Sequence, residues 1–137
     1  MTCVLRAIGA AFDVEAFLAE SPLRPEAVYR KGDRVFANLP KGPMRFDSGF
    51  NLTVSEAGMD DLPGQVREAI AFLDENEDEL RRLGACEGVD AVGLDFGLRR
   101  RDVAAQSDLL PAELLWRAGA LDIDITVSHY AVADEPD

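Results

Sequence analysis

The chain has 137 residues, of which 47% are apolar and 29% charged, and its formal net charge is −12. This length and balance predict one compact domain over residues 1–137, with enough apolar surface for a real core. So strong a negative charge repels nucleic-acid phosphates and anionic membrane surfaces, which excludes both as expected partners.

The charge is distributed unevenly along the chain. Residues 1–50 contain seven Lys/Arg and six Asp/Glu, whereas residues 51–137 contain seven and twenty. The acidic second half favours either a basic protein partner or simple solubility, and solubility is the simpler interpretation.

The N-terminus and the two cysteines predict a cytoplasmic protein. Arg6 interrupts the apolar stretch where a signal peptide needs an unbroken core, and no apolar run reaches the length of a membrane span. Cys3 and Cys86 lie far apart without a C-x-x-C pair, so we expect buried free thiols and no zinc or redox motif.

The first predicted elements are a strand and a short helix. The apolar run at 3–10 predicts a buried strand. Asp13 is a good N-cap for the helix that follows, and Phe12 and Phe17 stand at the two positions of a hydrophobic staple. Pro22 ends this helix near residue 20.

The next segment alternates in polarity in two places. Residues 34–39 and 50–56 alternate in polarity, which predicts a strand at 34–39 and a half-buried strand at 50–56. Between them, residues 40–49 contain two prolines and two glycines, which predicts a loop.

The longest predicted helix covers about residues 62–83, with Pro63 in its first turn and Gly84 just after its end. Its apolar stripe is the expected core contact and consists of Val66, Ile70, Leu73, Leu80 and Leu83. Residues 74–79, which we call the acidic segment, contain five carboxylates; the simpler interpretation is a solvated helix face.

The last predicted elements are a strand at 89–98, a helix at 111–119 and a strand at 121–130. In the final strand four apolar residues alternate inward, namely Leu121, Ile123, Ile125 and Val127. Residues 132–137 are expected to form a frayed acidic tail.

These elements predict an α+β fold. Their order begins β-α-β-β-α-β, which matches a ferredoxin-like split βαβ core, and continues with an added short helix and a C-terminal strand. The helices are expected to pack on a single sheet.

Motifs for catalysis or cofactor binding are absent from the sequence, which contains neither a P-loop nor a G-x-G-x-x-G pattern. The single histidine, His129, has no nucleophile tied to it by any signal, so a structural role is expected. Asp122 and Asp124 form a D-x-D pair, but even with Asp90 or Asp95 they supply few oxygen ligands. We therefore predict no catalytic residue, cofactor or metal, and expect the outward aspartates to pair with the arginines at 99–101.

Arg24, Arg30, Lys31 and Arg34 surround a Gly-Asp pair early in this acidic chain, and the turn that holds the last three of these cations is the candidate binding site. Its residues are Arg30, Lys31, Gly32, Asp33 and Arg34. Gly32 is expected to adopt a positive φ, and Asp33 to close the turn through its side chain. The cations either neutralise the acidic second half or bind an anion or a partner; the structural alternative is the simpler one.

Three stretches resemble a bacterial family of unknown function, the DUF4279-like domains. They are the "RPEAVYRKGD" turn, the strand and long helix from "GFNLTVSE" to "ELRRLG", and "LLPAELLWRAGALDIDITV" near the end. The family often has tryptophan on its middle strand, where this chain has Phe50. The resemblance implies no chemistry, but it implies a binding role, because some relatives accompany secreted toxins as immunity proteins.

The leading hypothesis is therefore a small acidic, non-enzymatic binding protein, such as an immunity protein that binds a basic toxin with the acidic segment. The alternative is a protein or enzyme that binds a small anion at the Arg/Lys-Gly-Asp turn. A structural accessory subunit is the third class, and a large exposed apolar patch would favour it. The sequence leaves the oligomeric state open.

Overall fold

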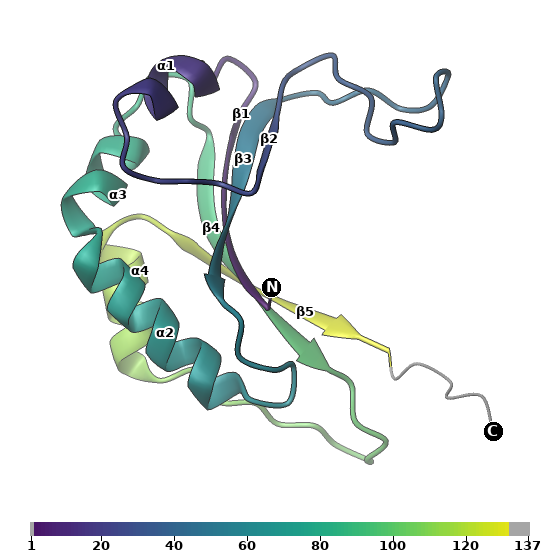
Figure 1. Ribbon diagram of the computed structural model, residues 1–137. Helices are drawn as coiled ribbons and strands as arrows, with labels where there is room; N and C mark the ends of the chain where they lie inside the picture. The colour runs from purple at the N-terminus through teal and green to yellow at the C-terminus, as the bar shows by residue number, and fades with distance from the viewer. Residues whose placement is uncertain (1, 132–137) are drawn as a thin grey trace.

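The computed structural model describes residues 2–131, which form an α+β fold with one open five-stranded mixed sheet and four helices (Figure 1). The strands are β1 (Cys3–Gly9), β2 (Ala27–Tyr29), β3 (Ser48–Ser55), β4 (Ala91–Arg99) and β5 (Asp124–Tyr130). The helices are α1 (Val14–Ala19), α2 (Leu62–Glu75), α3 (Glu77–Gly84) and α4 (Ala112–Ala120). The tail predicted at 132–137 lies outside the described residues.

The strand order across the sheet is β2-β3-β1-β4-β5. Strand β1 pairs antiparallel with both β3 and β4, and β2 pairs antiparallel with β3. Strand β5 runs parallel to β4, because helix α4 provides the crossover that a parallel pair requires. The helices lie on one side of the sheet, which leaves the other side open (Figure 1).

An aromatic cluster fixes α1 on the end of the sheet. The Asp13 carboxylate accepts from Ala16 N at 3.1 Å, and the rings of Phe12 and Phe17 lie 6.1 Å apart, so the predicted cap and staple are confirmed. Phe50 of β3 is fully buried and its ring stacks on Phe17. An indole at position 50 would therefore have to place its N–H donor in this apolar cluster.

The strand predicted at 34–39 is wrong. Strand β2 is instead Ala27–Tyr29, which precedes residues 34–39 in the chain. Within 34–39, Arg34 alone forms a β-bridge, an isolated one with Met44. The alternation at 34–39 does not represent a sheet face, because Phe36 and Leu39 are both about half exposed. A three-residue edge strand is too short to leave a periodic signal of its own.

The single helix predicted at 62–83 is two helices, with Asn76 as the C-cap of α2 and the N-cap of α3. Both the backbone N and Nδ2 of Asn76 donate to Phe72 O at 3.0 Å, so its amide competes with the helical pattern at this point. The predicted stripe is otherwise correct. Val66, Leu73, Leu80 and Leu83 are buried, while Ile70 is only half-buried.

The last strand begins later than predicted. Asp122 has φ 58° and belongs to a turn after α4, and β5 starts at Asp124. Leu121 and Ile123 are nevertheless buried as the alternation predicts. Within residues 2–131 no helix has the length and apolar character needed to cross a membrane.

Candidate functional site: a basic loop between two strands

The residues predicted as a binding site lie at the start of a long connection between β2 and β3. We call residues 30–47 the basic loop, because its eighteen residues include five Lys/Arg and two Asp/Glu. Figure 1 shows that it projects from the sheet on the side away from the helices. Connections longer than about 12–15 residues are uncommon in compact domains and usually functional or disordered.

The basic loop begins with the predicted turn. Gly32 has φ 92°, and the carboxylate of Asp33 accepts from Arg30 N at 2.9 Å, so both conformational predictions are confirmed. Asp33 N donates to Arg30 O at 2.9 Å, and Lys31 N donates to Ser48 Oγ at 2.9 Å. These contacts close the turn on itself and on the start of β3.

Backbone hydrogen bonds across the basic loop hold it in an ordered shape. Gly32 N donates to Arg45 O at 3.0 Å, Arg45 N to Asp33 O at 2.7 Å, and Val35 N to Pro43 O at 3.0 Å. The two halves of the loop are thus paired like a short irregular hairpin. A surface ordered in this way loses less conformational entropy when it binds.

The cations of the basic loop interact locally. Arg30 forms an ion pair with Glu15, Arg34 Nη1 donates to Gly42 O at 2.7 Å, and the Arg45 guanidinium lies 4.2 Å from the centre of the Tyr29 ring. Among residues 2–131 we find no ion pair between the loop cations and the acidic second half. Neutralisation of the acidic second half by direct ion pairs with these cations is therefore not observed among the described residues.

Large apolar side chains accompany the cations, and sequence reasoning missed them. Four are exposed by about half or more: Phe36 (52%), Leu39 (48%), Met44 (48%) and Phe46 (88%). The alternation at 34–39 predicts a strand, and that prediction gives no sign that Phe36 and Leu39 are exposed. The signal available was Met44 and Phe46, two large apolar residues in a stretch that its prolines and glycines already identify as a loop.

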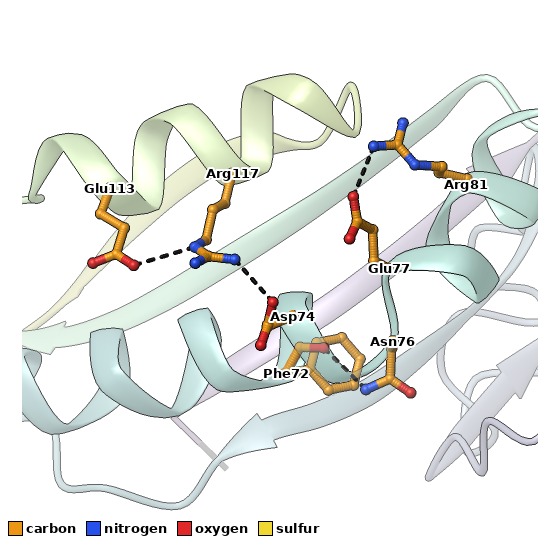
Figure 2. A network of polar contacts seen from close by, with 7 residues as sticks. All are labelled: Phe72, Asp74, Asn76, Glu77, Arg81, Glu113 and Arg117. Atoms are coloured by element: carbon orange, nitrogen blue, oxygen red, sulfur yellow. Dashed lines mark hydrogen bonds and ion pairs between the residues drawn. The ribbon is translucent and has the colours of Figure 1, made fainter.

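The acidic segment is largely satisfied by intramolecular ion pairs. Figure 2 shows Asp74 facing Arg117 of α4, at 3.1 Å, and Glu77 facing Arg81, at 2.8 Å. Glu79 is 2.6 Å from Arg82. Three of the five carboxylates thus have cationic partners within the fold.

The break at Asn76 also changes the electrostatics of the acidic segment. In one continuous helix these carboxylates would stand late in the helix and oppose its dipole. In the structure Glu77, Asp78 and Glu79 form the first turn of α3, where negative charge is favourable. The helix dipole therefore stabilises these three carboxylates, and their placement needs no functional explanation.

The other residues considered from the sequence do not assemble into a reaction site. Asp90, Asp122 and Asp124 line one hollow, but residues 2–131 contain no group of three His, Cys, Asp or Glu side chains placed to hold a metal. Asp95 instead pairs with Arg6 and accepts from Ser128 Oγ at 2.7 Å. Of the three arginines expected to pair with Asp122 and Asp124, Arg99 pairs with Asp60 and Arg101 with Asp108, while Arg100 forms no ion pair within residues 2–131.

Both cysteines are free thiols, but only one is fully buried. Cys3 is fully buried, and burial, together with the nearby Asp95 and Glu68 carboxylates, raises its pKa to about 12. Cys86 is half-buried, so its predicted burial is only partial.

Comparison with known proteins gives no match to a family model, a curated protein or a solved structure.

Proposed function

We propose that this protein is a small non-enzymatic binding protein that docks on another protein through the basic loop. The observation that carries the proposal is the group of four exposed apolar side chains interleaved with five cations on one ordered loop. Aromatic residues, Met and Arg are enriched at protein interfaces, and aromatic and Arg side chains supply most hot spots.

The contacts of the turn favour a protein partner over a small anion. The four N–H groups of residues 30–33 already donate to acceptors within the chain. The turn therefore has no free backbone donors for the kind of anion-binding concavity that successive N–H groups can form. The exposed apolar side chains, in contrast, gain stability only when a large surface covers them.

The role that we propose within this class is that of an immunity protein whose partner is a toxin. Its support is the resemblance to the DUF4279-like domains, together with the exposed loop. Contact through the loop requires an apolar partner surface bordered by carboxylates, because the loop presents apolar side chains between cations.

The test is affinity capture from the native host, with purified protein as bait and mass spectrometry of what it retains. Three baits are compared: wild type, Phe46→Ser, and the matched control Trp116→Ser, whose ring on α4 is 71% exposed. We expect a protein retained by wild type and Trp116→Ser and lost with Phe46→Ser. Equal retention by all three baits would refute contact through the loop.

A second candidate keeps the acidic surface as the contact and a basic toxin as the partner. It rests on Glu75 and Asp78, which are exposed and form no ion pair within residues 2–131. An acidic surface would accelerate association with a basic protein, most strongly at low salt. In the same capture experiment, Glu75→Lys with Asp78→Lys would then lose the partner while Phe46→Ser kept it.

For the fold, we propose a ferredoxin-like unit of β1, α1, β2, β3, the α2–α3 helix pair and β4, to which α4 and β5 are added. Its support is the order β2-β3-β1-β4 with antiparallel pairs throughout. The unit would end at β4, because β5 is the one strand that joins the described sheet in parallel. An experimental structure that shows the crossovers right-handed would support this, and a left-handed crossover would contradict it.

A further inference from the structure

A groove of about 520 Å³ lies between the first half of α2 and the connection from β4 to α4. The elements that line it lie at the end of the molecule opposite the basic loop (Figure 1). Pockets for small molecules commonly measure about 300–1,000 Å³ and are mostly apolar. The groove therefore has the size of a ligand site, and it is separate from the surface proposed for protein binding.

The apolar part of the groove lining is mostly aliphatic. Leu62, Val66 and Leu98 are buried beneath it, and Ile70 lies half-buried beside them. Leu109 stands at the groove with 76% of its surface exposed, which leaves apolar area for a ligand to cover. Within residues 2–131 no aromatic side chain lines the groove, so its apolar walls fit a flexible alkyl chain.

The charged residues around the groove are not equivalent. Asp60 pairs with Arg99 at 3.7 Å, while Asp108 accepts from Arg101 at 3.3 Å and from Gln106 Nε2 at 2.9 Å. Arg67 is exposed and has no ion-pair partner within the described part of the chain. Among the groove-lining residues that the structure describes, the one charge without an ion-pair partner is therefore the Arg67 guanidinium.

We propose that this groove binds a medium-chain aliphatic carboxylate, with the alkyl chain over Val66, Ile70 and Leu98 and the carboxylate at Arg67. The apolar walls select the chain through burial, and the guanidinium selects the negative head through charge-assisted hydrogen bonds. The proposal needs no partner protein and does not depend on the basic loop.

The test is calorimetric titration of the full chain with decanoate, decanol and decyltrimethylammonium at neutral pH. We expect saturable binding of decanoate at one site per chain, weaker binding of decanol, and the weakest binding of the cation. Arg67→Gln should weaken decanoate binding about tenfold and change decanol binding little, because it removes only the charged contact.

Three control variants separate the groove from other surfaces. Arg100→Gln removes a nearby exposed arginine that does not line the groove, and should leave decanoate binding unchanged. Phe46→Ser in the basic loop should also have no effect, so failure here and failure of the protein-binding proposal can be distinguished. Ile70→Trp should block the groove and abolish binding of both decanoate and decanol, with circular dichroism to verify that it folds.

Two results would overturn the proposal. The first is decanoate binding that does not saturate, or that Arg67→Gln and Ile70→Trp leave intact. The second is a wild-type dimer in light scattering that Ile70→Trp converts to a monomer. That result would assign the groove to a second copy of the chain.

Discussion

Substitution of Leu73 tests how much α2 contributes to the stability of the core. Its side chain on α2 is 2% exposed within the main apolar cluster. Leu73→Ala should lower the free energy of unfolding by about 2–5 kcal/mol, from lost burial and the cavity left behind. Leu115→Ala, at a site 47% exposed, should change it by less than about 0.5 kcal/mol. Chemical denaturation measures both, and equal stabilities would mean that the buried face of α2 is wrongly assigned.

The two thiols should differ sharply in reactivity. The pKa of Cys3 is raised from 9.0 to about 12, while Cys86 is partly accessible. Because the thiolate is the reactive form, a thiol reagent at pH 8 should modify Cys86 in the native protein and Cys3 only after unfolding. Rapid modification of both native thiols would contradict the burial of Cys3.

The raised pKa of Cys3 also affects stability. The folded protein keeps the Cys3 thiol protonated to higher pH than the unfolded chain does. The resulting contribution to the free energy of unfolding is therefore fully present below about pH 9. It should be lost as pH rises from there toward 12, which denaturation at several pH values can measure.

At the scale of elements, the break at Asn76 can be tested with two carboxylates three residues apart. Glu75 stands in the last turn of α2 and Asp78 in the first turn of α3. Glu75→Gln should therefore raise the free energy of unfolding, and Asp78→Asn should lower it, each by about 0.3–1 kcal/mol. Thermal denaturation at low salt measures both. Changes of the same sign would favour one continuous helix.

The shape of the basic loop depends on Gly32. Its φ of 92° disfavours a side chain, so Gly32→Ala should open the turn at a cost of about 1–2 kcal/mol. Hydrogen exchange of the Arg45 amide, which donates to Asp33 O, should become faster. Gly119→Ala is the control, because Gly119 lies in α4 with open space around it, and it should stabilise slightly. An unchanged Arg45 exchange rate in Gly32→Ala would show that the loop does not need this turn.

Elements with strong local signals were predictable from the sequence, and elements fixed by distant contacts were not. The Asp13 cap and the Phe12–Phe17 staple are encoded within six residues, and the structure confirms both. Strand β2 has only three residues and exists because β3 offers it an edge. The alternation at 34–39 suggested a strand, but no neighbouring strand pairs with it beyond a single bridge.

For the candidate site, the sequence predicted the turn but not the surface around it. The φ of Gly32 and the closure by Asp33 follow from residue chemistry alone. The exposure of Phe36 and Phe46 depends on where the loop projects, which no local pattern reveals. The groove at Arg67 was also unpredictable, because it joins α2 to a connection about forty residues later in the chain.

At the scale of the whole molecule, the basic loop and the elements that line the groove at Arg67 lie at opposite ends of the fold (Figure 1). The acidic segment between them is mostly paired within the fold, which leaves solubility as the simplest role for the remaining net charge. The basic loop thus presents both apolar side chains and positive charge on a molecule of net charge −12.

The dissociation constant of the captured partner is the most direct measure of contact through this loop. Titrations of the purified partner with wild type, Phe46→Ser and Trp116→Ser at one salt concentration give the three dissociation constants to compare. We predict that Phe46→Ser weakens binding about tenfold or more, as loss of an interface anchor does, while Trp116→Ser stays within about twofold of wild type. Equal dissociation constants for wild type and Phe46→Ser would contradict the account.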